Sequence, residues 1–119
     1  MRPIPKSLLI HAVTLHKKIN KDKWGKGELD KGTELTYVRM EPSEKIVRDK
    51  NNAEIQLVAT LFYDCKNSNP KNVKFETDDL IKFNGMMHRV EVVEPLYDNK
   101  RLHHYELGLV KGWLKSAQE

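Results

Sequence analysis

Five histidines and one cysteine are the side chains that could bind a metal or act as a nucleophile. They are His11, His16, His88, His103, His104 and Cys65. Structural zinc sites usually take their ligands in pairs, a few residues apart within tight turns. His11 and His16 instead share a predicted strand, and the adjacent strand residues His103 and His104 are expected on opposite faces. The spacing therefore predicts no metal site.

Nucleophilic and paired-carboxylate catalysis are not indicated either. Cys65 opens a polar segment, and the sequence has neither a glycine-framed serine elbow nor a metalloprotease histidine pair. Asp78 and Asp79 stand just before a predicted β-hairpin, where they are interpreted as turn residues. We therefore predict that the protein is not an enzyme, and we assign no catalytic residue and no cofactor.

A lysine-rich segment is the clearest candidate for contact with a charged partner. Residues 17–31 contain six lysines and three acidic residues, a local excess of +3 in a chain whose net charge is +4. The candidate residues are Lys17, Lys18, Lys21, Lys23, Trp24 and Lys26. This pattern allows a small β-barrel module that holds phosphates and stacks a base on the tryptophan. A solvated loop is the alternative, because such modules usually present several aromatic side chains.

The composition is that of a soluble globular chain with one modest core. Its 119 residues are 39% hydrophobic and 32% charged. No apolar run approaches the ~20 residues that span a bilayer, so we expect no membrane segment and synthesis in a host cytoplasm. A single cysteine excludes an intrachain disulfide, so the fold has to rest on its core.

The N-terminal half predicts two strands separated by a long loop. The first strand covers residues 9–16, with Val13 and Leu15 facing inward. Residues 17–32 have no apolar period and contain three glycines, which indicates a loop. The second strand runs over residues 33–41, where the apolar pattern shifts from positions 35 and 37 to 38 and 40, as a change of face or a β-bulge would produce.

Three readings are open for residues 43–52: a loop, a short helical turn or an open hairpin tip. The clearest strand follows over residues 53–64. Its residues expected to face the core are Ile55, Leu57, Ala59, Leu61 and Tyr63. Residues 66–71 are polar, contain a proline and predict a surface loop.

Asn84-Gly85 is a strong signal for a β-hairpin between strands at 79–83 and 86–97, because both residues tolerate positive φ. The face predicted to be buried carries Met86, His88, Val90 and Val92. A turn at 98–100 leads to a last strand at 103–110, and residues 111–119 are a flexible or short helical tail. The sum predicts an all-β fold: one domain over residues 1–119, with its core at about 8–110, built as a small barrel or sandwich of about six strands in largely meander order with long loops.

The order of these features resembles a known family. The resemblance rests on six segments: residues 14–16 (Thr-Leu-His), 23–25 (Lys-Trp-Gly), 40–43 (Met-Glu-Pro-Ser), 78–85 (Asp-Asp-Leu-Ile-Lys-Phe-Asn-Gly), 89–95 (Arg-Val-Glu-Val-Val-Glu-Pro) and 104–107 (His-Tyr-Glu-Leu). Over about residues 8–110 the chain resembles the minor capsid proteins of phages and prophages of low-GC Gram-positive bacteria. It is more distantly similar to the head-completion proteins, called stopper or head-closure proteins, of long-tailed phages.

This resemblance implies a structural part of the virion at the head-tail junction. It implies a ring of several copies that docks on the portal protein, extends or closes the DNA channel and offers a surface to the tail or tail-joining protein. By position, residues 42–52 would approach the channel, and their charges place Lys45, Arg48 and Lys50 nearest the packaged DNA, in non-specific contact. A nucleic-acid-binding module that uses residues 17–31 is the alternative function.

Overall fold

The computed structural model describes residues 2–21 and 27–112, and strands are the only regular elements in these ranges. The strands are β1 (His11–His16), β2 (Lys18–Lys21), β3 (Gly27–Leu29), β4 (Thr33–Pro42), β5 (Ile46–Arg48), β6 (Glu54–Gln56), β7 (Ala59–Asp64), β8 (Leu80–Phe83), β9 (Met86–Asp98) and β10 (Arg101–Lys111). The predicted all-β class is therefore confirmed. The buried hydrophobic side chains run from Leu9 to Val110.

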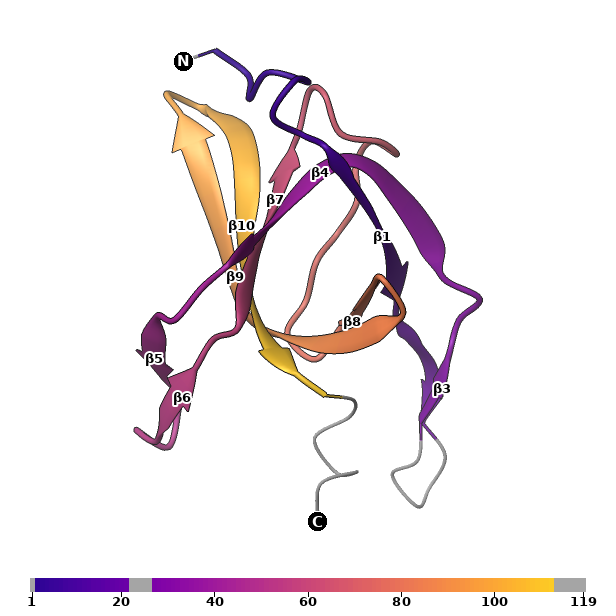
Figure 1. The fold of residues 1–119 in the computed structure, drawn as a ribbon, viewed down its shortest axis with the longest axis vertical. Coiled ribbons are helices and arrows are strands. Elements are labelled where there is room, and N and C mark those ends of the chain that lie inside the picture. Colours follow the sequence, from indigo (N-terminus) through magenta and orange to yellow (C-terminus); the bar gives the residue numbers. More distant parts are fainter. Residues whose placement is uncertain (1, 22–26, 113–119) are drawn as a thin grey trace.

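Six strands close into a barrel in the order β1-β4-β7-β10-β9-β8, and β8 pairs back to β1 (Figure 1). All neighbouring strands in it are antiparallel. Strands β1, β4 and β7 form one meander, and β8, β9 and β10 form a second. The connection over residues 65–79 crosses between the two meanders, because β7 lies beside β10 while β8 lies beside β1. This is the predicted barrel of about six strands in largely meander order.

Two short hairpins stand outside the barrel as separate two-stranded sheets, β2-β3 and β5-β6. Figure 1 shows both extending from the lower half of the barrel. The β2-β3 hairpin lies in residues 17–32, so the prediction of a plain loop there was wrong. Of the three structures predicted as possible for residues 43–52, the hairpin is confirmed, because β5 pairs with β6.

The predicted continuous strand at 53–64 is broken in the structure. Residues 54–56 pair with β5, whereas residues 59–64 pair with β4 and β10. The exchange of partners happens at two residues: the Leu57 amide donates to the Lys45 carbonyl at 2.8 Å, and the Val58 amide donates to the Leu109 carbonyl at 2.8 Å. Apolar alternation runs unbroken through this point, which is why the sequence conceals the break.

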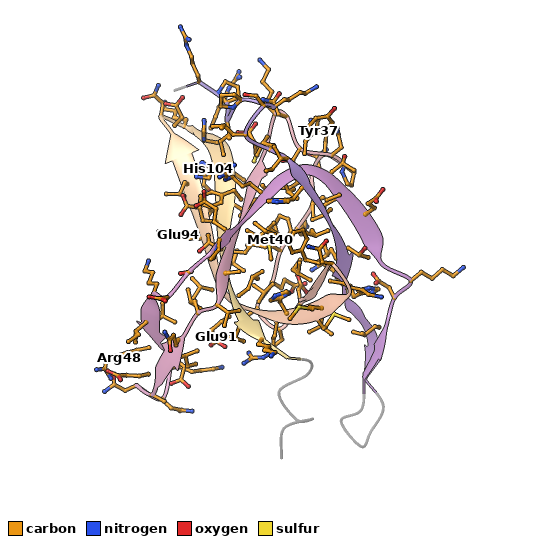
Figure 2. The ribbon with its side chains drawn as sticks, viewed as in Figure 1. Tyr37, Met40, Arg48, Glu91, Glu94 and His104 are labelled. Carbon is orange, nitrogen blue, oxygen red and sulfur yellow. The ribbon has the colours of Figure 1, made fainter. Side chains whose placement is uncertain are left out.

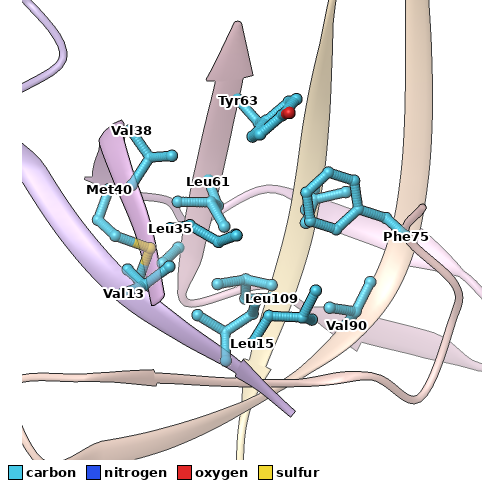
Figure 3. Close-up of a cluster of buried hydrophobic side chains, with 13 residues drawn as sticks. Val13, Leu15, Leu35, Val38, Met40, Leu61, Tyr63, Phe75, Val90 and Leu109 are labelled. Atoms are coloured by element: carbon cyan, nitrogen blue, oxygen red, sulfur yellow. The ribbon is translucent and has the colours of Figure 1, made fainter. Parts of the chain in front are cut away.

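The core fills the barrel and gathers side chains from both meanders (Figure 3). The fully buried members include Leu35, Val38, Leu61, Leu107 and Leu109, each at 0% exposure. At one end, the Phe75 ring meets those of Tyr63 and Tyr105 edge-on, at centroid distances of 5.2 and 5.1 Å. The inward positions predicted for the first strand and for residues 59–63 are thereby confirmed.

A β-bulge in β4 explains the shifted apolar pattern of that strand. The register places Val38 opposite His11 and Leu35 opposite Val13, so β4 has one more residue than β1 in this interval. Tyr37 takes up the difference with a φ of 55° and is turned outward, 43% exposed. Leu35 and Val38 can therefore both point inward, as a bulge permits and a regular strand does not.

A second irregularity corrects the predicted inner face of β9. Gly108 of β10 pairs with Val92 of β9, and the next residue, Leu109, pairs with Val90. One residue of β9 is therefore extra in this interval. Val90 thus faces the core, and beyond the bulge it is Val93 that packs against the core cluster, while Val92 lies on the outer wall. Met86, at the barrel end beside the turn, is 52% exposed. The prediction that Met86 and Val92 face inward was therefore wrong.

The connection over residues 65–79 is tied to the barrel at the β4 bulge. Thr36 and Asn69 exchange backbone hydrogen bonds of 2.9 and 3.0 Å, and the hydroxyl of Ser68 donates to the carbonyl of Tyr37. Ser68 is completely buried and also accepts from the Asp64 amide. The predicted surface loop at 66–71 therefore has one buried polar anchor, which satisfies backbone groups that the bulge leaves unpaired.

Candidate functional site

The β5-β6 hairpin is the structured form of the segment predicted to approach DNA. Its turn is built locally: Asp49 Oδ1 accepts from the amides of Asn51 at 2.8 Å and Ala53 at 2.9 Å. Asn52 adopts a positive φ of 63°, which asparagine tolerates well. Arg48 donates to the Asn52 carbonyl at 2.9 Å and to the Glu54 carboxylate at 3.1 Å. These bonds give the hairpin a defined shape without a core of its own.

The foot of this hairpin rests on the outer wall of the barrel. Leu57 is 3% exposed yet does not belong to the core cluster. A Cβ placed on Gly108 would lie 2.8 Å from Leu57 Cδ1 and 3.3 Å from Val92 Cβ. Leu57 is thus buried against the outside of β9 and β10, at a place that only glycine leaves open. The predicted inward orientation of Leu57 was wrong, and Ile55, in the hairpin, is only half-buried.

The three basic residues predicted nearest the DNA all lie on this hairpin, but acidic residues accompany them. Residues 44–54 contain three basic side chains and three acidic ones, so their formal charge cancels. Arg48 is paired with Glu54, as described above. Lys45 lines a recess of about 40 Å³ at the hairpin foot together with Glu94 and Glu106. The hairpin therefore offers a shape rather than a strongly positive surface.

A cleft of about 280 Å³ separates the hairpin tip from β9 and the segment before β8. Arg48 and Lys50 line one side, and Asp78, Arg89 and Glu91 line the other. Arg89 is almost fully buried, and its Nη1 donates to Asp78 at 3.2 Å and to Glu91 at 2.8 Å. The labels in Figure 2 place Arg48 on the hairpin and Glu91 on the barrel beside it. Acidic groups thus face the basic ones across this cleft.

The β2-β3 hairpin carries the other predicted interaction segment. Lys23, Trp24 and Lys26 lie outside the described residues, and of Lys18 and Lys21 only the backbone strand is described. The side chain of Lys17, at the base, is only 28% exposed. Its Nζ donates to Asp79 at 2.9 Å and to Glu76 at 3.0 Å. One of the six candidate residues is therefore engaged in holding two segments of the barrel together.

Asp79 closes a turn over residues 76–79, as the sequence indicates, but its side chain is buried and structural. Its Oδ2 accepts from Lys17 Nζ and from the Glu76 amide at 2.8 Å. Burial raises the pKa of the Asp79 carboxyl, against the opposing effect of Lys17. Burial lowers the pKa of Lys17, but its hydrogen bonds to Asp79 and Glu76 outweigh that effect and raise the pKa overall. The pair thus behaves as a partly buried ion pair.

The histidine pair on β10 is the largest departure from the sequence prediction for a candidate site. His103 and His104 do not point to opposite faces: their Nδ1 atoms lie 2.7 Å apart. The register shift between Leu102 and His104 leaves His103 as an extra residue, which turns the two rings together. His103 Nε2 contacts the Arg2 carbonyl at 2.6 Å, and His104 Nε2 contacts Glu106 at 2.9 Å.

His103 helps to hold the N-terminal segment, residues 2–8, against the outer wall. Ile4 donates its amide to Asp64 at 3.0 Å and accepts from the Asn67 side chain at 2.8 Å. Arg39 donates to the Leu8 carbonyl at 3.0 Å. Between this segment and strands β4, β7 and β10 runs an open groove of about 710 Å³, which Phe62 and His104 also line.

Cys65, the candidate nucleophile, is a free and partly buried cysteine. Burial raises the pKa of the Cys65 thiol, with a further rise from neighbouring Asp64, and this lowers its thiolate fraction at neutral pH. Within residues 2–21 and 27–112, no group of three or more His, Cys, Asp or Glu side chains could hold a metal ion. The same part of the chain has no helix long and apolar enough to cross a membrane.

The family relationship follows from the sequence over the barrel. Residues 5–109, which include every barrel strand except the last residues of β10, match the family described as minor capsid protein. The chain belongs to the minor capsid protein family. Its match extends through both hairpins and ends two residues before the end of β10. No curated protein matches the chain.

Membership of the minor capsid family confirms the resemblance found in the sequence, at the level of the family. It makes the chain a structural component of a phage virion. A structural family is consistent with the sequence analysis, which assigned no catalytic residue. In this minor capsid protein, the two hairpins and the outer-wall groove are the features that the barrel core does not require.

Proposed function

We propose that this minor capsid protein is a head-completion protein, a connector of the stopper type at the head-tail junction. In this role several copies dock as a ring on the portal protein, extend or close the DNA channel, and present a surface to the tail or tail-joining protein. Support comes from the family match and from the more distant resemblance to head-closure proteins, whose order of segments the chain shares.

The observation that carries the proposal is a hairpin with a fixed shape that contributes nothing to the core. None of residues 44–56 is buried, yet their turn is closed by local hydrogen bonds and their foot is fitted to Gly108. A segment that is ordered but dispensable for packing is typical of a functional element on a rigid scaffold. A hairpin that projects into the channel would need such a shape, because it has to stay ordered without support from the core.

The charges indicate how such a hairpin would act on DNA. Lys45, Arg48 and Lys50 would lie nearest the DNA, but the equal number of acidic residues leaves little long-range attraction. Contacts of single lysines or arginines with phosphate are also screened by salt. We therefore expect the hairpin to narrow the channel mainly by its bulk, with the basic side chains as minor, non-specific contacts.

The proposed ring forms on the portal rather than in solution. Most large apolar side chains of the described residues are buried in the barrel, and only seven are exposed, three of them at one end of the barrel. A large obligate interface needs a more continuous apolar surface. Light scattering of the free protein should therefore give the mass of one chain, and a stable ring at all concentrations would contradict this arrangement.

The connector role is tested by deleting the gene in its phage and complementing it in trans. The expected result is normal capsid assembly and DNA packaging, followed by loss of DNA from the heads or failure to attach tails. Purified portal rings should bind the protein and position it at the channel exit in electron micrographs. Infectious particles without the protein, or location of the protein on the capsid lattice away from the portal, would reject the role.

A further inference from the structure

The groove beneath the N-terminal segment is a surface that the barrel core does not need. It measures about 710 Å³, within the range of about 300–1,000 Å³ that is usual for binding pockets. Its floor is the outer wall of β4, β7 and β10, where Phe62 and the His104 ring stack at an interplanar angle of 22°. One side is the N-terminal segment, which contributes Pro3, Ile4 and Leu8.

Several large apolar side chains around the groove are exposed to solvent. Leu8 lines the groove and is 48% exposed, and Ile10 and Tyr37 nearby are 63% and 43% exposed. Three of the seven large exposed hydrophobic side chains of the described residues thus belong to this end of the barrel. Concentrated apolar exposure beside a concave site indicates contact with another molecule.

The charges at the groove are predominantly positive. Its lining includes Arg2 and Arg39 but only one carboxylate, Glu41, which Arg39 holds at 2.8 Å. Lys6 lies close by, with its Nζ 5.0 Å from the centre of the Tyr37 ring. An occupant that carries both an apolar side chain and a carboxylate would match the floor and the rim together.

We propose that this groove binds an extended segment of a partner protein, in which an apolar anchor residue is flanked by aspartate or glutamate. The apolar anchor lies on Phe62 between the barrel wall and Leu8, and the acidic side chain reaches Arg2 or Arg39. This proposal adds a binding site to the connector role. It rests on that role only in taking the partner to be another virion protein. The groove itself exists in the single chain.

The test uses the full chain and an array of overlapping 15-residue peptides from the virion proteins encoded beside it, its own sequence included. The expected result is that bound peptides share an apolar residue next to acidic ones. Leu8→Glu should weaken binding of the best peptide about tenfold, because it places a charge on the apolar wall and repels carboxylates. Ile46→Glu is the matched control: the same change at a more exposed aliphatic residue, on the β5-β6 hairpin outside the groove, should leave the affinity within about twofold.

Each alternative occupant gives a different result. Peptides from this chain alone, together with self-association that Leu8→Glu abolishes, would replace the partner by a second copy and overturn the proposal. Binding of a DNA oligonucleotide that Leu8→Glu and Arg39→Gln both remove would overturn it in favour of nucleic acid. Absence of any peptide whose binding depends on Leu8 would also reject it, provided that both glutamate variants melt like the parent protein.

The outcome can be separated from that of the connector role. If gene deletion blocks head-tail joining but no peptide binds the groove, the groove proposal fails and the connector role stands. If a peptide with apolar and acidic residues binds in a Leu8-dependent manner but gene deletion leaves head-tail joining intact, the connector role fails. The groove is then a binding site on a minor capsid protein that lies elsewhere in the virion.

Discussion

The barrel wall and the β5-β6 hairpin are built from similar strands but are stabilised in different ways. In the wall, Leu61 and Leu107 are at 0% exposure and each strand has two hydrogen-bonded neighbours. In the hairpin, Ile46 is 58% exposed and the strands have only each other. The wall depends on long-range burial, whereas the hairpin depends on its turn and on the contact of Leu57 with the barrel at its foot. Folding and function are therefore expected to respond to different substitutions.

The largest effect is expected inside the wall. Leu61→Ala removes a fully buried side chain at the centre of β7, and such cavities cost about 2–5 kcal/mol of unfolding free energy. Ile46→Ala makes a comparable change on the exposed hairpin and should alter stability by no more than about 0.5 kcal/mol. Urea unfolding followed by circular dichroism measures both. Equal losses for the two variants would remove the distinction between the two regions.

The ion pair at the base of β2-β3 should come next. Lys17→Met leaves the buried Asp79 carboxylate without its cation, at an expected loss of about 2 kcal/mol at neutral pH. Lys31→Met, at an exposed lysine, is the control and should change little.

The same pair predicts how stability depends on alkaline pH. Because the pKa of Lys17 is raised above 10.5 in the folded state, its contribution is present below that pH and is lost as the pH rises through the higher folded value. The stability difference between the parent and Lys17→Met should therefore shrink in this window. A difference that stays constant to pH 12 would show that Lys17 acts through packing and not through its charge.

A smaller effect is expected where the two regions meet. Gly108→Ala places a Cβ 2.8 Å from Leu57 Cδ1, the mobile end of a side chain, and should cost about 1 kcal/mol. The double variant with Leu57→Ala should recover part of that loss, because the obstructing atoms are removed. Strictly additive losses would mean that Gly108 does not set the position of the hairpin foot.

Alternation of apolar residues predicted the barrel because Val13 and Leu15 of β1, residues 59–63 of β7 and residues 105–109 of β10 place an apolar side chain at every second position, facing the core. Asn84-Gly85 likewise predicted the β8-β9 turn, where Asn84 and Gly85 have φ values of 51° and 77°. The shift at Tyr37 was visible in the sequence as a break in alternation, which a bulge then explained. These features are local, so a single segment contains all the information needed.

The remaining features depend on contacts between distant segments. Leu57 continues the apolar pattern of β7, and only the pairing of Lys45 with Leu57 shows that it lies outside the core. The contact of His103 with His104 requires a bulge that the register with β9 imposes. The groove was not foreseen, because it joins residues near position 4 with residues near 40, 62 and 104. Its one sequence signal is the exposed apolar pair Leu8 and Ile10 just before the first strand.

The central claim, that the β5-β6 hairpin serves the virion and not the fold, is tested most directly by shortening it. The Leu57 amide already bonds to the Lys45 carbonyl, so replacing residues 46–56 by Asn-Gly closes a two-residue turn on that bond and keeps Leu57 in place. We predict a change in unfolding free energy of about 1 kcal/mol or less. In complementation the variant should give DNA-depleted or tailless heads, and charge reversal of Lys45, Arg48 and Lys50 should act in the same direction but more weakly. A normal yield of infectious particles from the well-folded shortened variant would contradict the account.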